Sequence, residues 1–415
     1  MARSPLTLAA AATAALSSSS RSGVAIVGAA PLSEGGAGRF DSALLHVADG
    51  GRLVVRVPTS DDAEADLARE EKALAGLTMG VRSLLGFTAP EVLGRTRLGD
   101  RVARVQTHLA GYRVDAAHVP PGRGVATALA HAIASVHDLP ASVVQAAGLP
   151  TATAAQVHTQ TEELLDRAEA TGRLPFGLLR RWSRALGAEA LWRFEPTVTL
   201  GGVDPSAFTF ADDDDVPVIR GLLSWAGLRV GDPAEDLRWV SSAPDARGDV
   251  LAAYAAATDH APDAMLGERA RLHAELEFAK WLVHGHEIGS ASIMDDAVAL
   301  LDSLDQSVRD EPPIAAGTVT VDDAIAALGR VPDGHAEAID TSMQTDAYDP
   351  GSMDLFEDEE EPKTTTHAAG DADLETEPIG FGDWTPDEEP ATPDDDDRDP
   401  GDAARNALRR WTGTA

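Results

Sequence analysis

The 415-residue sequence contains no cysteine. Disulfide frameworks, thiolate metal sites and cysteine nucleophiles are therefore excluded, and the absence is compatible with the reducing cytoplasm, where we place the protein. Basic residues are also scarce, since 34 Lys and Arg stand against 68 Asp and Glu, and the net charge is −34. Such a chain lacks the basic face that nucleic acids and anionic membrane surfaces require, so we expect neither as a partner.

Long apolar runs are missing as well, because no stretch approaches the roughly 20 residues that a bilayer-crossing helix needs. The Ala-rich segment 1–22 carries one Arg before its apolar run and has some features of a secretory leader. However, Ser4-Pro5 is a typical N-cap and first-turn pair. We therefore favour an N-terminal helix that packs on the first lobe.

Acidic residues dominate the end of the chain. Residues 341–404 contain 22 Asp or Glu and only two bases. A segment of this composition cannot bury enough apolar surface to offset the entropy lost on ordering. Residues 309–415 are therefore predicted to form a disordered acidic tail. Binding of a protein partner is one role that such a tail can have.

The rest of the chain changes from strands to helices. Residues 23–112 contain β-branched, partly alternating segments around a helical stretch at 63–77, and Asp212 to Asp215 are typical of a solvated turn between two strands. Residues 113–308 show mainly helical apolar spacing, in segments 127–137, 154–170, 178–191, 249–258 and 263–284. Strands followed by helices predict an α+β, two-lobed architecture.

Three short motifs occur in order in the second region. They read Leu200-Gly-Gly-Val-Asp-Pro-Ser-Ala207, Leu223-Ser-Trp225 and Gly231-Asp-Pro-Ala-Glu-Asp-Leu237. Their order and spacing resemble the motifs His-Gly-Asp-x-x-Pro-x-Asn, Ile-Asp-Trp and Gly-Asp-Pro-x-x-Asp-Leu of the aminoglycoside and macrolide phosphotransferase family. The resemblance covers roughly residues 5–305 and implies a bilobal protein-kinase-like fold with a small β-rich N-lobe, a helical C-lobe and a catalytic loop in 200–237.

The groups that phosphoryl transfer needs are absent from these motifs. In the family, the loop Asp deprotonates the substrate hydroxyl, and the Asn and the second Asp hold Mg²⁺. Those positions are occupied here by Gly202, Ala207 and Ser224, and Leu200 replaces the His. A lost general base alone lowers the rate by about 10²- to 10⁴-fold. A methyl group and a neutral hydroxyl are poor Mg²⁺ ligands, so no metal site is predicted.

The resemblance also assigns nucleotide contacts in the N-lobe. Arg56 stands where the family has the Lys that pairs the α- and β-phosphates, and Glu70, with Glu71 as the alternative, matches the Glu that pins this Lys. Gly35 and Gly36 lie where a glycine-rich loop would cover the phosphates. Each feature has a structural alternative: a glycine cluster is more often only a turn, and Glu70 lies in a run of charges typical of a solvated helix face.

Two histidine positions are interpreted as structural. His137 falls at the end of a predicted helix, where the helix dipole favours it. His284 and His286 are two residues apart, which places their rings on different faces of a helix and argues against a metal site.

Two functions remain open for the folded part. The first is a catalytically degenerate phosphotransferase-family protein, a pseudokinase that binds a small molecule, ATP or another nucleotide. The alternative is an active ATP-dependent macrolide or aminoglycoside O-phosphotransferase that uses displaced acids such as Asp204 and Asp232. In a third reading, the tail carries the function and the folded part presents it. We favour the first because the chemical groups are lost together at three positions.

Overall fold

The computed structural model describes residues 3–18, 23–32, 38–261 and 263–315. These belong to one of two units into which the chain divides, and the other unit, residues 332–397, lies outside them. The predicted acidic tail beyond residue 315 also lies outside the described residues.

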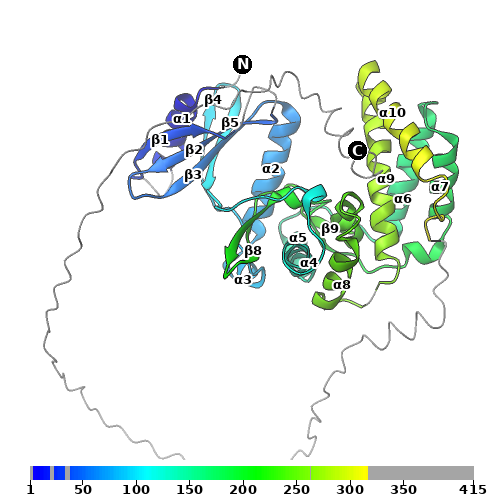
Figure 1. The fold of residues 1–415 in the computed structure, drawn as a ribbon. Helices are drawn as coiled ribbons and strands as arrows, with labels where there is room; N and C mark the ends of the chain where they lie inside the picture. Colours follow the sequence, from blue (N-terminus) through cyan, green and yellow to red (C-terminus); the bar gives the residue numbers. More distant parts are fainter. Residues whose placement is uncertain (1–2, 19–22, 33–37, 262, 316–415) are drawn as a thin grey trace, which may run out of the picture. The chain divides into compact units, whose positions relative to one another are not determined.

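A five-stranded antiparallel sheet forms the N-lobe (Figure 1). Its strands, in the spatial order β1-β2-β3-β5-β4, are β1 (Ile26–Pro31), β2 (Phe40–Val47), β3 (Arg52–Pro58), β5 (Arg101–Thr107) and β4 (Val92–Leu98). Burial alternates along β2 and β3, so that Ala43, Leu45, Val55 and Val57 give the sheet one apolar face.

Helix α1 (Pro5–Ser17) packs on this apolar face. Leu8 and Leu16 of the helix are buried in one cluster with the apolar residues of the sheet. The helix approaches β4 so closely that a Cβ atom at Gly94 would lie 2.6 Å from the carbonyl oxygen of Ala15. The contact therefore requires a residue without a side chain at position 94.

Helix α2 (Asp61–Gly76) contacts the opposite side of the sheet, through side chains of β3 and β5. Ser60 caps it by accepting a hydrogen bond from the Ala63 N–H at 3.2 Å. The short helix α3 (Met79–Leu84) follows.

Helices make up most of the C-lobe. They are α4 (Val125–His137), α5 (Ala141–Ala146), α6 (Ala154–Ala170), α7 (Phe176–Leu186), α8 (Arg247–Ala257), α9 (Leu266–Glu287) and α10 (Ala291–Ser307), with the 3₁₀ segments η1 (Ala116–His118), η2 (Glu189–Trp192), η3 (Pro205–Ala207) and η4 (Pro233–Ser242). Two separate cores hold these elements together. One surrounds Trp225 and α4, and the other surrounds Trp182, α9 and α10.

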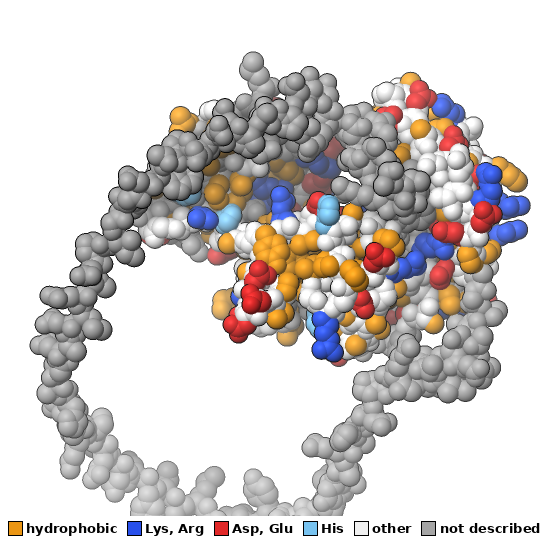
Figure 2. Space-filling view, viewed as in Figure 1, with side chains coloured by type: hydrophobic (Ala, Val, Ile, Leu, Met, Phe, Trp, Pro, Cys, Tyr) orange, Lys and Arg blue, Asp and Glu red, His pale blue; other side chains and the backbone are white. Residues whose placement is uncertain are grey.

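Two small antiparallel sheets interrupt the helices. They pair β6 (Thr197–Thr199) with β9 (Arg229–Gly231) and β7 (Phe208–Asp213) with β8 (Val216–Leu222). The turn between β7 and β8 is acidic and exposed, as predicted, and acidic side chains gather at this end of the hairpin (Figure 2). Asp214 and Asp215 have φ of 49° and 62°, the left-handed backbone that two-residue hairpin turns require.

The predicted α+β, two-lobed fold class is confirmed. Several elements were not predicted: the short helices α3 and α5, helix α10, strands β6 and β9, and β4, where Gly94, Arg95 and Arg97 interrupt the apolar signal. Residues 309–315, which we assigned to the tail, include Ile314, which is 3% exposed in the core of α9 and α10. Among the described residues, no helix is long and apolar enough to cross a membrane.

Candidate functional site

The loop between β6 and β7 is held in place by one buried carboxylate. Asp236, in η4, accepts hydrogen bonds from the backbone N–H groups of Leu200 at 2.6 Å, Gly202 at 2.6 Å and Val203 at 3.2 Å. The side chain is fully buried. The third sequence motif thus makes a physical contact with the first, in which the Asp236 carboxylate fixes the loop backbone.

His137 completes this buried network. Its Nε2 donates to Asp236 at 3.1 Å, and its Nδ1 lies 2.7 Å from the Tyr254 hydroxyl. Burial alone would raise the pKa of Asp236, but the hydrogen bond from His137 and those from the loop backbone outweigh it and lower this pKa. His137 ends α4, as predicted. It braces the loop indirectly, by holding the Asp236 carboxylate to which the loop backbone is bonded.

Gly202 lies at the family position of the catalytic base. Its φ of +90° is a conformation that residues with a side chain rarely adopt. A Cβ atom built there would overlap the guanidinium of Arg238, two residues beyond Asp236. The space expected to hold a carboxylate therefore holds a cation.

The two positions of the Mg²⁺ ligands lie next to each other. The Leu223 N–H donates to the Ala207 carbonyl at 2.9 Å, which brings Ser224 beside the loop. Ala207 offers only a methyl group, and Ser224 offers an exposed neutral hydroxyl. Among the described residues, no group of three or more His, Asp or Glu is placed to hold a metal ion. These residues do not fit Mg²⁺.

The two acids proposed as substitutes differ in their surroundings. Asp204 is exposed and accepts from the Ser206 N–H at 2.8 Å, where it begins η3. Asp232 is buried, and its oxygens accept from Arg269 Nε at 3.0 and 3.1 Å and from His273 Nε2 at 2.9 Å. Burial would raise the pKa of Asp232, but the charge of Arg269 and the hydrogen bond from His273 lower it to about 2. Because Arg269 and His273 already occupy its oxygens, Asp232 is poorly placed to replace the missing general base.

The predicted N-lobe pair is present in the structure. Arg56 Nη1 lies 2.7 Å from Glu70 Oε2, and the guanidinium stacks 4.1 Å from the centre of the Phe40 ring. Arg104, opposite Arg56 in the sheet, pairs with the same Glu70 oxygen. Glu70 is buried, which rules out the solvated helix face as its setting.

The two glycines assigned to the phosphate-covering loop, Gly35 and Gly36, lie outside the described residues.

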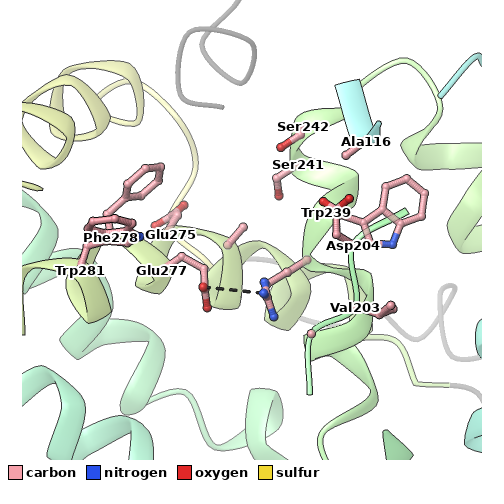
Figure 3. Close-up of a pocket in the computed structure, with 13 residues that line it drawn as sticks. Ala116, Val203, Asp204, Trp239, Ser241, Ser242, Glu275, Glu277, Phe278 and Trp281 are labelled. Atoms are coloured by element: carbon pink, nitrogen blue, oxygen red, sulfur yellow. Dashed lines mark ion pairs between the residues drawn. The ribbon is translucent and has the colours of Figure 1, made fainter. Parts of the chain in front are cut away.

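A cavity of about 210 Å³ opens beside Gly202 (Figure 3). Trp239, Ser241 and Ser242 of η4 form one wall, and Phe278 and Trp281 of α9 lie across from them. The complete lining consists of Ala116, Gly202, Val203, Asp204, Arg238, Trp239, Ser241, Ser242, Ala274, Glu275, Glu277, Phe278 and Trp281.

Sequence reasoning placed Gly202 and Asp204 at this site but missed Arg238 and the aromatic residues. The signal for Arg238 was its place just after the third motif, two residues beyond Asp236. Nothing in the sequence showed that this residue points back at Gly202.

Both the sequence and the fold are similar to those of known proteins. Residues 34–273 match the sequence profile of the phosphotransferase enzyme family. The fold is similar to that of apo macrolide 2'-phosphotransferase MphH from Brachybacterium faecium, with a TM-score of 0.59 and 23% identity over 72% of this chain and 98% of that one.

Two further solved structures are similar. Macrolide 2'-phosphotransferase type I has a TM-score of 0.56 at 21% identity, over 72% of this chain and 98% of that one. A GDP complex of aminoglycoside 2'-phosphotransferase-IIIa has a TM-score of 0.58 at 16% identity, over 73% and 99%. No curated protein gives a significant sequence match.

Proposed function

The chain belongs to the phosphotransferase enzyme family, and on that basis we propose that it binds a nucleotide or small molecule without transferring phosphate. One observation carries the proposal: the Arg238 guanidinium fills the space that a side chain at Gly202 would need. Gly202 has no side chain to act as a general base, and the Arg238 guanidinium beside it is permanently charged and cannot accept a proton.

The physical requirements of phosphoryl transfer support the proposal. The reaction depends on a positioned nucleophile and on cations that neutralise the developing phosphate charge. Loss of the base lowers the rate by about 10²- to 10⁴-fold. Metal stabilisation of the transferring group is worth several kcal/mol more, and neither Ala207 nor Ser224 carries a carboxylate or amide oxygen to hold the metal.

Nucleotide binding is supported by the N-lobe. Arg56 projects from β3 with its charge only partly neutralised, because Glu70 is shared with Arg104. A guanidinium can bind phosphate oxygens through paired N–H donors. The GDP complex of aminoglycoside 2'-phosphotransferase-IIIa shows a nucleotide on a similar fold, and we extend that property to this chain as part of the proposal.

The competing function is an active small-molecule kinase, and one observation favours it. Asp204 is exposed, lies two residues beyond Gly202 and lines the cavity, so its carboxylate is within reach of a bound substrate. Asp232 contributes less to this alternative, because Arg269 and His273 already occupy its oxygens.

A thermal-shift titration tests the proposal. The full chain is titrated with ATP and with GTP, each with and without Mg²⁺. We expect a weak rise in melting temperature that is the same with and without the metal, because a ligand of the native state raises its stability. Strong stabilisation that requires Mg²⁺ would contradict the proposal.

A phosphotransfer assay separates the two functions. The chain is incubated with ATP or GTP, Mg²⁺ and a macrolide or an aminoglycoside, and product is followed by mass spectrometry. We expect no product above background. Turnover at an ordinary kinase rate that disappears in Asp204→Asn would establish the active alternative instead.

A further inference from the structure

Hydrogen-bond donors gather on one wall of the cavity beside Gly202. Arg238, Trp239, Ser241 and Ser242 all belong to η4, a 3₁₀ segment, and all line the cavity. In a 3₁₀ helix, residues three apart lie on the same face. Arg238 is therefore aligned with Ser241, and Trp239 with Ser242, so that this short segment presents polar groups to the cavity in two adjacent rows.

Arg238 has unused hydrogen-bonding capacity. Its ion-pair partner among the described residues is Glu277, with Nη2 and Oε2 3.7 Å apart (Figure 3, dashed line), too far for a hydrogen bond. Glu277 is already bonded to Lys280 Nζ at 2.6 Å. The side chain of Arg238 is 23% exposed and lines the cavity, so a ligand there can reach it.

Two neighbouring groups on the same wall are buried without a partner. Within the part of the chain that the structure describes, the Trp239 Nε1–H and the Ser241 hydroxyl make no hydrogen bond, although the residues are 5% and 7% exposed. A buried donor left unpaired costs about 1–3 kcal/mol. A ligand that carries acceptor oxygens relieves this cost.

The acidic groups of the cavity are, in contrast, already bonded. Glu275 accepts from Arg181 Nε at 3.0 Å and from Trp182 Nε1 at 2.9 Å. Asp204 accepts from the loop backbone, and Glu277 from Lys280. Arg238 is the charged group of this lining that lacks a hydrogen bond within the described residues.

Besides its two glutamates, α9 contributes apolar side chains to the cavity. Phe278 and Trp281 project from α9 side by side toward the cavity, and Ala274 lies one turn before Phe278 (Figure 3). Flat aromatic side chains of this kind bury a ligand's apolar surface efficiently.

From these contacts we infer that the cavity binds an oxyanion, a carboxylate or a phosphate, carried on a flat apolar body. The oxyanion accepts hydrogen bonds from Arg238 and Ser241, and the apolar body packs against Phe278 and Trp281. This inference rests on the proposed function, because the charge that attracts the anion stands where a working kinase would need a base. It also predicts that cationic antibiotics are disfavoured at this site.

A set of four naphthalene probes tests the inference. Naphthalene-1-carboxylate, 1-naphthyl phosphate, the neutral 1-naphthamide and the cationic 1-naphthylmethylamine are titrated into the full chain without nucleotide, by calorimetry. We expect at least one anion to bind about tenfold or more tightly than the amide, since a charge-assisted hydrogen bond contributes this much. The stronger of the two anions identifies the oxyanion as carboxylate or phosphate.

Variants connect the binding to the donors. Arg238→Met removes the charge while keeping a side chain of similar length, and we expect it to abolish the preference for the anion over the amide. Ser241→Ala removes a hydroxyl without a partner, so the fold is retained and anion affinity falls several-fold. Arg193→Met, which removes an exposed guanidinium outside the cavity, is the matched control and leaves the preference intact.

Equal binding of all four probes, tighter binding of the cation, or an unchanged preference in Arg238→Met would each overturn the inference. The proposed function is tested separately by the phosphotransfer assay. A chain that transfers no phosphate and shows no anion preference contradicts only the cavity ligand, whereas ordinary kinase turnover contradicts the proposed function itself.

Discussion

A single side chain fixes the loop between β6 and β7. The buried carboxylate of Asp236 holds three backbone N–H groups of the loop and the ring of His137. A carboxylate bonded in this way stabilises the fold only while every partner is in place, because a donor left unpaired after its removal is costly.

Replacing Asp236 by Ala is expected to destabilise the protein by roughly 3–5 kcal/mol, as for one partner removed from a buried charged network. Urea unfolding measures the loss. Asp204→Ala, on the same loop but exposed, is the matched control and costs about 1 kcal/mol, as for a lost helix cap. Similar losses in the two variants would show that Asp236 does not brace the loop.

Asp232 gives the protein a predictable response to acid. Its pKa is about 2 in the folded state and ordinarily 3.8, so its charged form stabilises the fold above about pH 4. This contribution, about 2 kcal/mol, is lost as the pH falls toward 2. The Asp232→Asn variant lacks this charge-dependent contribution. The difference in unfolding free energy between the parent protein and this variant therefore narrows as the pH falls from 5 to 2.5. A constant difference over that range would contradict the assignment.

Gly202 and Arg238 are expected to be energetically coupled. Gly202→Ala forces a side chain into a left-handed backbone, at about 1–2 kcal/mol, and also displaces the guanidinium. Arg238→Ala removes the overlap but not the backbone strain. In a double-mutant cycle on unfolding free energy, we expect the double variant to be more stable than the sum of the single losses indicates. If the losses of the two single variants simply add, the expected contact between Arg238 and a side chain at position 202 is contradicted.

At this scale, the sequence predicted the loop and its missing groups. These follow from residue types at fixed spacing. The direction of Arg238 depends instead on the 3₁₀ winding of η4, which no local pattern indicated.

Helices α7 and α9 are joined by a buried ion pair. Glu275 of α9 is fully buried and accepts hydrogen bonds from Arg181 and Trp182 of α7. Arg181 also donates to the Pro312 carbonyl at 3.1 Å, which ties the segment after α10 to the same point.

Removing the ion pair between Arg181 and Glu275 is expected to weaken the contact between α7 and α9. Arg181→Met is expected to destabilise the protein by about 3–5 kcal/mol, because Glu275 remains buried without its main partner. Arg180→Met, at the exposed neighbouring position of α7, stays within about 0.5 kcal/mol of the parent. Chemical denaturation of both variants checks the result, and equal stabilities would contradict it.

Several long helices, α6 and α9 among them, were predictable because their apolar spacing extends over several turns. Helix α9 was expected at 263–284 and spans Leu266–Glu287. Strand β4 was missed because it lies at the edge of the sheet, where Arg95 is exposed and Gly94 accommodates α1. The contact that explains this glycine is made to a helix about 80 residues earlier in the chain, and local patterns carry no trace of it.

For the molecule as a whole, the C-terminal limit of the folded part lies beyond α10. Ile314 is buried with α9 and α10, although composition placed this segment in the tail. We expect a chain ending at residue 308 to be less stable than one ending at 315 by about 2–3 kcal/mol, mainly from the apolar surface of Ile314. Melting curves of the two truncated chains measure the difference. Identical curves would contradict the packing of this segment.

The contact between α1 and Gly94 also has a consequence for biosynthesis. During translation, α1 emerges about 80 residues before β4 and β5, which it covers. At about 5–20 residues per second, the helix waits several seconds at the ribosome with its apolar face uncovered. The N-lobe sheet therefore closes only after residue 107 has left the exit tunnel, and until then the apolar residues of α1 lack the strands that bury them in the folded protein.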